Sequence, residues 1–374
     1  MFGKAWKGKN MRIALIGTRG IPARYGGFET CAQELSSRLV KKGHEVWAYC
    51  RSGYYDKKLQ EYKGVKLVYL PECRTKVLDT LSHTLLSLVH ARWKKYDIIL
   101  VFNYANSPLL ILPKLWGKKV ILHIDGLEWQ REKWRGLGRI YFKFAEWLSL
   151  RLGVELITDS KYLQKYYKDK YDKRIHFIPY GAALQASRNP AILNRYGLKP
   201  QEYFLQVTRF EPENNPLLSI QAFKRAGTDK ALVLVGGVPY RSAYADEIFS
   251  YKDSRVKRPG FIYDQTILRE LLCNCYAYIH GNEVGGTNPG LLQAMASGCF
   301  VICIDVPFNR EVLQGAGAYF RKDVESLKEK IAWTLANESL IKTKAEEAKN
   351  IIKNNYNWSQ VVDKYLEIFS RFSS

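Results

Sequence analysis

Four segments of the 374-residue chain combine glycines with charged or amide side chains in ways that suit phosphate and sugar binding. The first, residues 17–30, reads GTRGIPARYGGFET and contains four glycines and two arginines, Arg19 and Arg24. Glycines let a backbone approach a ligand closely, and the N-terminus of a helix favours an anion. The segment lacks the G-x-G-x-x-G fingerprint and no acidic residue ends the next expected strand, which disfavours a nicotinamide-dependent enzyme. We therefore expect a functional, anion-binding loop.

The second segment, residues 123–134, reads HIDGLEWQREKW and begins at the end of an expected strand. It places Asp125 and Glu128 just past the carboxyl end of that strand, where doubly wound folds put their sites. Asp125 could orient a sugar hydroxyl or stabilise a developing cation, or it could cap a turn. His123 could point into a core as readily as toward a ligand.

The third segment, residues 208–215, reads TRFEPENN and ends the first expected strand of the second half. Its Arg209 carries a planar, permanently charged guanidinium, which suits a pyrophosphate. Residues 212–215 could also start the next helix.

The fourth segment, residues 280–290, reads HGNEVGGTNPG and runs into an expected helix over 291–297. A glycine-rich turn that opens into a helix N-terminus presents unpaired amides to a phosphate. Gly286, Thr287 and Asn288 are the natural cradle. A tight surface turn is the alternative interpretation.

Short apolar segments that alternate with helical patterns must position these residues. Strands are predicted in the first half at 12–16, 45–49, 65–70, 97–102, 119–124, 155–158 and 175–178, and in the second at 203–207, 231–235, 256–261, 276–279 and 300–304. Helical patterns include 29–42, followed by Gly43 as a C-cap signal, and 323–336, 339–354 and 358–371. Such βα alternation predicts a parallel, doubly wound sheet in each half.

Pro179, Tyr180 and Gly181 lead into the small-residue stretch GAALQAS, which indicates a hinge. We therefore predict an α/β protein with two Rossmann-like domains facing across a cleft. The N-terminal domain is expected over 1–180 and the C-terminal domain over 181–357. A last helix near 358–374 could pack back onto the first domain.

Composition excludes several protein classes. An apolar content of 47% is too high for intrinsic disorder, and the longest apolar runs are shorter than the roughly 18–20 residues that span a bilayer. The basic N-terminus has no apolar region of a secretory signal behind it, which favours a cytoplasmic protein. We expect the cysteines at 31, 50, 73, 273, 275, 299 and 303 to be buried, reduced thiols, because their spacing suits neither a metal site nor a redox pair.

The net charge of +22 is unevenly distributed. Residues 1–180 contain 34 Lys+Arg and 16 Asp+Glu, net +18, whereas residues 181–374 contain 24 and 20, net +4. Such a surface attracts nucleic acid or an anionic membrane leaflet, with plain solubility as the alternative. Helical spacing could place aromatic rings beside basic groups on one face, as an interfacial helix requires. The residues concerned are Trp134, Arg135, Arg139, Tyr141, Phe142, Lys143, Phe144 and Trp147.

Taken in order, the motifs resemble the retaining GT-B glycosyltransferases of family four. The resemblance rests on Gly26 and Gly27, GHEV at 43–46, R-x-x-P-E at 209–213, the strand ending near Gly260, and GGTNPGLLQAMASG at 285–298. More narrowly, GTRGIPARYGGFET, DGLEWQREKW, RFEPENN and EVGGTNPGLLQAMA look like the bacterial rhamnosyltransferase branch that builds capsular and cell-wall polysaccharides. The resemblance covers essentially the whole chain.

The family implies a nucleotide-sugar donor bound mainly by the C-terminal domain and an acceptor bound mainly by the N-terminal domain. By position, Arg209 contacts the donor pyrophosphate, while Asp125 takes the place of a histidine that many relatives have near the sugar. The other donor residues implied are Gly26 and Gly27 at the phosphates, Gly260, Phe261 and Ile262 at the base, and Gly286, Thr287 and Asn288 at the phosphate or the sugar. Acceptor-side residues are expected to be Arg19, Arg24, Tyr25, Glu128 and Trp129.

The chain departs from the family pattern in the donor site. Most family-four enzymes have two glutamates eight residues apart; here Gln293 takes the second place and Gly285 the first, and Glu283 lies two residues early. Asn214 replaces the usual lysine, so pyrophosphate binding loses a charge. At the ribose-contacting position, the Gln293 amide can bond one hydroxyl, which suits a deoxyribose donor such as a dTDP-sugar.

The resemblance implies front-face transfer with retention, in which the departing phosphate oxygen helps deprotonate the acceptor hydroxyl. Arg209 and the helix amides would then stabilise the leaving pyrophosphate while Asp125 and Glu283 orient the sugar, with no metal, cofactor or dedicated nucleophile. The expected reaction transfers L-rhamnose from dTDP-L-rhamnose to a polyprenyl-pyrophosphate-linked saccharide. The enzyme would work at the inner face of the cell membrane, whose anionic lipids attract the basic half.

Other functions stay open at this point. A mannosyl-, glucosyl- or galactosyltransferase that uses a GDP- or UDP-sugar is the main alternative. A nucleic-acid-binding protein would explain the charge, but the chain has no recognition-helix or RNA-binding signature. A nucleotide-sugar epimerase or dehydrogenase would need the dinucleotide fingerprint that the chain lacks.

Overall fold

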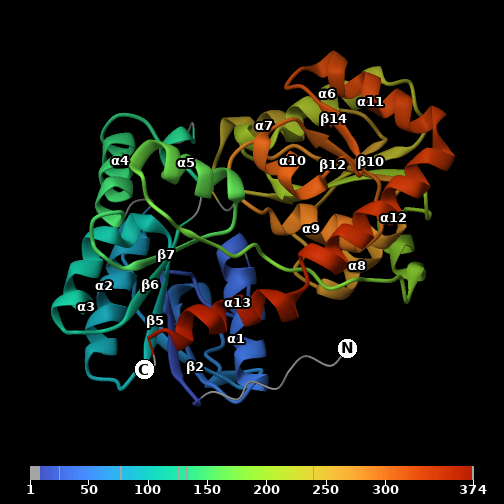
Figure 1. The fold of residues 1–374 in the computed structure, drawn as a ribbon. Coiled ribbons are helices and arrows are strands. Elements are labelled where there is room, and N and C mark those ends of the chain that lie inside the picture. The colour runs from blue at the N-terminus through green and yellow to red at the C-terminus, as the bar shows by residue number, and fades with distance from the viewer. Residues whose placement is uncertain are drawn as a thin grey trace. The chain divides into compact units, whose positions relative to one another are not determined.

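The computed structural model describes residues 9–24, 26–75, 78–124, 126–131, 134–238 and 240–372. The chain forms two compact units (Figure 1). The first unit comprises Met1–Tyr180 together with Trp358–Ser374, and the second comprises Gly181–Asn357.

The described residues of the first unit form an eight-stranded sheet in the order β3-β4-β2-β1-β5-β6-β7-β8. Its strands are β1 (Arg12–Ile16), β2 (Glu45–Arg51), β3 (Glu61–Tyr62), β4 (Val65–Leu70), β5 (Ile98–Phe102), β6 (Val120–Ile124), β7 (Glu155–Thr158) and β8 (His176–Phe177). Neighbouring strands are parallel except for β3, which pairs antiparallel with β4. The sequence did not predict β3. Lys63 (φ 50°) and Gly64 (φ 82°) form the two-residue turn between β3 and β4, and positive φ at both positions is typical of a hairpin turn.

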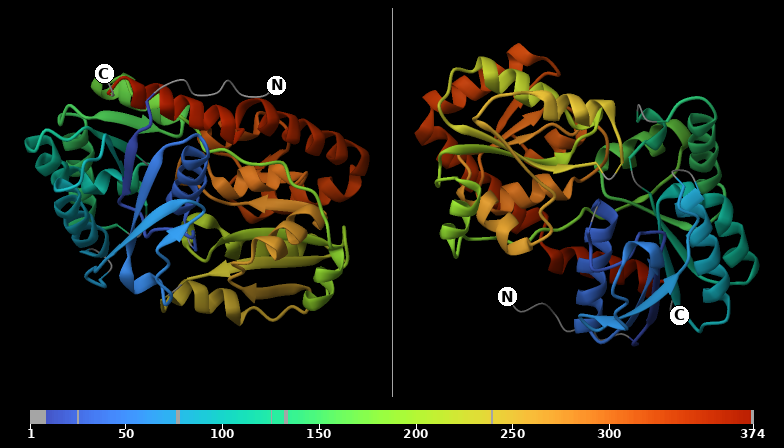
Figure 2. Two further views of the ribbon diagram at one scale, coloured as in Figure 1. Left: turned by 90° about the horizontal axis from the view of Figure 1, so that it is seen from below. Right: turned by 180° about the vertical axis from the view of Figure 1, so that it is seen from behind.

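Helices cover both faces of this sheet: α1 (Gly27–Lys41), α2 (Leu78–Arg92), α3 (Ile111–Leu115), α4 (Leu137–Ser149), α5 (Lys161–Tyr171) and α13 (Trp358–Ser370). Ala14 and Ile16 share a buried apolar cluster with Leu88 of α2 and Ala145 of α4, so α2 and α4 cover one face (Figure 2). The last helix, α13, packs beside α1 (Figure 1).

Two contacts join α13 to α1 and to Lys42, the residue that follows α1. Lys42 Nζ lies 2.9 Å from Asp363 Oδ1, and the Arg38 guanidinium lies 5.1 Å from the centre of the Trp358 ring. Helix α1 itself ends at Lys41, and Gly43 follows with φ 92°, as its C-cap signal predicts.

In the second unit, the residues that the structure describes form a six-stranded parallel sheet in the order β11-β10-β9-β12-β13-β14. Its strands are β9 (Tyr203–Arg209), β10 (Ala231–Gly237), β11 (Val256–Gly260), β12 (Ala277–His280), β13 (Val301–Ile304) and β14 (Ala318–Phe320). Its helices are α6 (Pro216–Arg225), α7 (Ala243–Ser250), α8 (Gln265–Asn274), α9 (Pro289–Ala296), α10 (Pro307–Leu313), α11 (Val324–Ala336) and α12 (Glu338–Asn355). The sequence did not predict β14, because three residues are too few to show a strand period.

The strand orders locate a switch point in each sheet. In the first unit, β2 lies on one side of β1 and β5 on the other, so the strand order reverses between β1 and β5. In the second unit, the order reverses in the same way between β9 and β12. Parallel α/β sheets bind ligands outside the carboxyl ends of the strands at such switch points. The segments after β1, β9 and β12 are three of the four that the sequence singled out.

Burial corrects two expectations. Five cysteines are buried free thiols, but Cys273 is half-buried and Cys73 is exposed, because residues 71–75 form no helix or strand before α2. The rings in and before α4 do not share one face: Phe142 is buried, whereas Phe144 and Trp147 are exposed. No helix among the described residues is both long and apolar enough to cross a membrane.

Candidate functional site

In the second unit, hydrogen bonds join the loop after β9 to the loop after β12. Asn215 Nδ2 donates to the Gly281 carbonyl oxygen at 2.8 Å, and Glu283 N donates to the Glu213 carbonyl oxygen at 3.0 Å. At Gly281 a Cβ atom would lie 2.5 Å from the Asn214 carbonyl oxygen, so only glycine permits this approach. The two predicted segments therefore form one structure at the switch point.

The turn after β9 ends in a left-handed residue. Residues Pro212–Asn214 form a 3₁₀ turn, Asn215 has φ 55° and ψ 33°, and α6 begins at Pro216. Residues 212–215 thus precede the helix instead of starting it, because a left-handed residue cannot continue a right-handed helix. Asparagine tolerates this conformation better than most residues, and proline favours the first helical position.

Arg209 is the last residue of β9, beside the switch point, and its side chain is half-buried. Asn214 Nδ2 donates to the Arg209 carbonyl oxygen at 3.0 Å, and Glu211 N donates to the same oxygen at 2.8 Å. The predicted donor residue Asn214 is itself buried. Its amide therefore fixes the main chain that carries Arg209.

Glu283 forms an ion pair that the sequence analysis missed. Its Oε1 lies 2.8 Å from Lys322 Nζ, just after β14, and it also accepts a hydrogen bond from Asn215 Nδ2. The two partners orient the carboxylate at the carboxyl edge of the sheet. No sequence signal identified Lys322, which lies 39 residues further along the chain.

The predicted phosphate cradle lies at the start of α9. Gly286 and Thr287 are buried, and Asn288 is the N-cap, whose Oδ1 accepts a hydrogen bond from Gly290 N at 2.9 Å. The helix begins at Pro289, two residues before the expected position, because the Asn288 cap and Pro289 at the first helical position favour an earlier start. Gln293 follows on this helix and is half-buried.

At the end of β11, the segment predicted to meet a base carries two stacked rings. Phe261 and Tyr263 lie 5.8 Å apart with an interplanar angle of 5°, and both are exposed. Gly260 has φ 79° and open space where a Cβ would lie, while Ile262 lies between the two aromatic residues. A flat, exposed aromatic pair can stack on a nucleobase, and Tyr263 is a residue that the sequence analysis did not select.

In the first unit, a buried carboxylate organises the glycine-rich loop. Glu29 lies in the first turn of α1, where its Oε1 accepts a hydrogen bond from Arg19 N at 2.9 Å. Gly26 has φ 105°, and a Cβ there would lie 2.4 Å from Glu29 Oε2. The positive φ favours glycine at position 26, and a larger residue would also displace the end of the Glu29 side chain. Gly27 begins α1.

The two arginines of this loop lie against the segment after β2. The Arg19 guanidinium lies 5.4 Å from the centre of the Tyr54 ring, and Arg24 Nη1 donates to the Tyr54 carbonyl oxygen at 3.0 Å. Burial lowers the pKa of Arg19, but the charge of Glu29 and a hydrogen bond with Tyr54 raise it more, so this guanidinium stays charged. Tyr25 lies outside the described residues.

The segment after β6 is held together by internal contacts. Glu128 is buried, and its Oε1 lies 2.6 Å from Arg131 Nε. Trp129 Nε1 donates to the buried carboxylate of Glu146 at 2.6 Å. These contacts fix the side chains of Glu128 and Trp129, whereas Asp125 lies outside the described residues.

His123 occupies the core instead of a site. It is completely buried and stacks between Phe102 and Tyr180, at ring-centre distances of 5.6 and 5.7 Å. Burial lowers its pKa to about 3, so the ring is neutral. The core alternative is therefore the correct one for His123.

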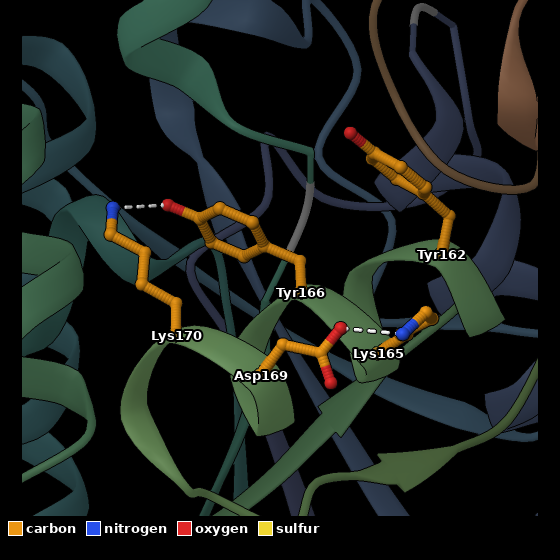
Figure 3. A pocket seen from close by; sticks show the side chains of 5 residues that line it. All are labelled: Tyr162, Lys165, Tyr166, Asp169 and Lys170. Carbon is orange, nitrogen blue, oxygen red and sulfur yellow. Dashed lines mark hydrogen bonds and ion pairs between the residues drawn. The ribbon is translucent and has the colours of Figure 1, made fainter.

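A shallow hollow of about 440 Å³ lies along α5 and was not expected (Figure 3). Tyr162, Lys165, Tyr166, Asp169 and Lys170 line it. Lys165 Nζ lies 2.6 Å from Asp169 Oδ2, and Lys170 Nζ donates to the Tyr166 hydroxyl at 2.6 Å. Each charged group of the hollow therefore has a partner within it. Among the described residues, no group of three His, Cys, Asp or Glu side chains could hold a metal ion.

Two family models match consecutive parts of the chain, and the boundary between them lies close to the boundary between the two units. Residues 10–183 match a domain of unknown function, DUF1972, and residues 190–358 match Glycosyl transferases group 1.

Two relatives are similar over part of the chain. An uncharacterized glycosyltransferase of Methanocaldococcus jannaschii is 37% identical over 98 residues, which cover 25% of each chain. An uncharacterized 42.6 kDa protein in the cps region of Klebsiella pneumoniae is 38% identical over 61 residues, which cover 16% of each. The similarity therefore spans a quarter or less of these relatives.

Solved structures match almost the whole chain. Sucrose-phosphate synthase of Thermosynechococcus elongatus has a TM-score of 0.80 at 17% identity, covering 97% of this chain and 99% of that one. Anabaena HepE in complex with UDP and glucose has a TM-score of 0.80 at 16% identity, covering 97% and 100%. WaaG, a glycosyltransferase involved in lipopolysaccharide biosynthesis, has a TM-score of 0.71 at 18% identity, covering 96% and 99%. Residues 190–358 of the second unit thus match Glycosyl transferases group 1, and the whole chain has the two-domain α/β fold of solved GT-B glycosyltransferases.

Proposed function

We propose that this protein is a retaining glycosyltransferase that transfers L-rhamnose from dTDP-L-rhamnose to a polyprenyl-pyrophosphate-linked saccharide. The observation that carries the proposal is the pair of hydrogen-bonded loops at the β9/β12 switch point. They bring Arg209, Glu283 and the start of α9 to one edge of the sheet, in the domain that matches Glycosyl transferases group 1.

In the proposed reaction, the bond between the anomeric carbon and the donor phosphate oxygen breaks on the same face as the new bond forms. The acceptor hydroxyl loses its proton to the departing phosphate oxygen, and the products are the glycosylated acceptor and a nucleoside diphosphate. Arg209 and the main-chain amides of the predicted cradle, Gly286, Thr287 and Asn288, stabilise the negative charge that develops on the pyrophosphate. Glu283, oriented by Lys322 and Asn215, positions the sugar, and Asp125 is proposed to act with it.

The donor assignment rests on the residues that contact the nucleotide. The exposed pair Phe261 and Tyr263 offers a stacking surface for the base. Gln293 supplies an amide where a carboxylate would bond both hydroxyls of a ribose, which favours a deoxyribose. A UDP- or GDP-sugar is the alternative donor, and HepE, a structural neighbour, has been solved with UDP-glucose.

The proposed acceptor places the protein at the cytoplasmic face of the membrane. A polyprenyl-linked saccharide stays in the bilayer, so the enzyme must reach it there. The net charge of +18 on residues 1–180 would attract that anionic surface.

The experiment is a donor screen with the full-length protein and a short synthetic lipid-pyrophosphate saccharide. We expect transfer from dTDP-L-rhamnose, detected by mass spectrometry, with the anomeric configuration of the product assigned by NMR. Preference for a UDP- or GDP-sugar would overturn the donor assignment, and an inverted product would overturn the retaining mechanism. Absence of transfer from every nucleotide sugar to lipid-linked and free saccharides would overturn the proposed function.

A further inference from the structure

Large apolar side chains remain exposed on three neighbouring helices of the first unit, α2, α3 and α4. All three helices pack against the segment Tyr104–Leu110 on the same side of the sheet (Figure 1, Figure 2). Trp93 and Leu115 are each 76% exposed and Leu137 is 84% exposed. We define the α2–α4 face as Leu78, Leu85, Leu86, Val89, Trp93, Ile111, Leu115, Leu137, Ile140, Phe144 and Trp147.

Helix α4 carries apolar side chains on two sides, although packing against the core requires them on one side only. Phe142 and Ala145 point into the first unit. Leu137, Ile140, Phe144 and Trp147 recur at intervals of three and four residues, which places them together on the outer side. A surface helix normally carries a single apolar stripe toward the core, so the outer stripe indicates a second contact.

Where the structure describes it, the surroundings of the α2–α4 face carry exposed charges of one sign. Among the described residues from 78 to 151, every exposed charged side chain is basic: Arg92, Lys94, Lys95, Lys114, Lys119, Arg135, Arg139, Lys143 and Arg151. The four acidic side chains that the structure describes in this stretch are buried or half-buried and bound internally. Asp79 binds Arg51, Asp97 accepts a hydrogen bond from Arg12 N, Glu128 binds Arg131, and Glu146 accepts a hydrogen bond from Trp129.

Basic groups lie directly over the exposed rings. The Arg151 guanidinium lies 4.3 Å from the centre of the Trp147 ring, which stacks on Phe144 at 6.0 Å. Arg92 lies 5.0 Å from the Trp93 ring in the same manner. Tryptophan and arginine together suit the boundary between acyl chains and headgroups, where an apolar body and a polar end are both satisfied.

We propose that the α2–α4 face docks on an anionic phospholipid bilayer. Phe144, Trp147 and the other apolar residues enter the headgroup boundary, and the surrounding lysines and arginines bind lipid phosphates. The sign of the charge selects this occupant, because a neutral apolar partner would need no basic rim. The docking would bring the enzyme to a lipid-linked acceptor, and this purpose rests on the proposed function. The docking itself is independent of that function.

The test is sedimentation of the full-length protein with vesicles of phosphatidylcholine alone or of phosphatidylcholine mixed with phosphatidylglycerol. Wild type is expected to bind only the mixed vesicles and to be released by salt. The double variants Ile140→Glu/Phe144→Glu and Arg139→Glu/Lys143→Glu should each bind at least about tenfold more weakly. Leu340→Glu, which changes an exposed leucine of α12 in the second unit, is the matched control and should bind as wild type does.

Two further measurements separate this inference from its alternatives. Brominated lipids should quench the tryptophan fluorescence of Trp147→Phe less than that of wild type. This substitution keeps an aromatic ring and should leave the fold intact. Equal binding to neutral vesicles, unchanged binding of both double variants, or self-association of wild type that Phe144→Glu abolishes would overturn the proposal. Both double variants should transfer sugar to a saccharide that lacks lipid as fast as wild type does. The transfer assay therefore tests the proposed function, and the vesicle-binding assay tests the docking.

Discussion

Lys322 Nζ lies 2.8 Å from Oε1 of Glu283, joining the end of β14 to the loop after β12 in the second unit. The Glu283 side chain is 21% exposed and the Lys322 side chain 49%, so water partly screens this ion pair. A pair of this kind contributes only about 0–1 kcal/mol to folding. Its importance should lie in orienting Glu283 at the edge of the sheet.

We therefore expect Lys322→Ala to lower kcat of sugar transfer by about tenfold while leaving the free energy of unfolding within about 1 kcal/mol of wild type. Lys322→Arg should recover much of the rate, because it restores a cation. Steady-state kinetics and urea denaturation measure both effects. A normal kcat in Lys322→Ala would show that Glu283 does not need this partner.

Arg209→Ala should lower kcat/KM by about a hundredfold or more, because a charge that stabilises the leaving pyrophosphate is lost. Arg209→Lys should recover only part of the activity, since an ammonium group cannot make the paired hydrogen bonds of a guanidinium. The matched control is Arg225→Ala, which removes an exposed arginine of α6 that pairs with Glu325. If Arg209→Ala turned over as fast as Arg225→Ala, the donor site would have to lie elsewhere.

Gly26→Ala should destabilise the first unit by about 1–3 kcal/mol, because φ is 105° and the new Cβ would lie 2.4 Å from Glu29 Oε2. Gly117→Ala shares a positive φ, 67°, but has open space around it, so it measures the backbone cost alone. Thermal denaturation of the two variants compares these effects. Equal losses would mean that the contact between Gly26 and Glu29 is dispensable.

Acid should destabilise the protein through its buried histidines. Burial lowers the pKa of His123 and of His280 to about 3, below the usual value of about 6.5. The unfolded chain therefore binds protons that the folded chain excludes, and stability falls as pH decreases from about 6.5 to about 3. Each histidine adds at most about 1.4 kcal/mol per pH unit.

His123→Phe checks this prediction, because it keeps the stack between Phe102 and Tyr180 and removes the ring nitrogens. Denaturant midpoints measured between neutral and acid pH should fall less steeply in this variant than in wild type. Parallel curves for the two proteins would show that His123 does not contribute to the acid sensitivity.

Much of the fold was predictable from local patterns. The bounds of β1, β4 and β7 agree with the predicted 12–16, 65–70 and 155–158, because each is a short apolar run between polar or glycine residues. The strands β3 and β14 were missed because two or three residues carry no measurable period. The left-handed Asn215 was missed because its conformation depends on bonds to Gly281 and Glu283 from another loop.

By itself, the sequence determined the α/β class and the positions of the glycine-rich and arginine-bearing segments along the chain, since both depend on short-range patterns. It also revealed the excess of basic and aromatic residues around α4, but it could not separate Phe142 from Phe144. Only the tertiary structure decided that one ring is buried while the other is exposed, and that Lys322 meets Glu283. Burial and ion pairing depend on which distant segments pack together, and that information is not contained in the spacing of residues along one helix or loop.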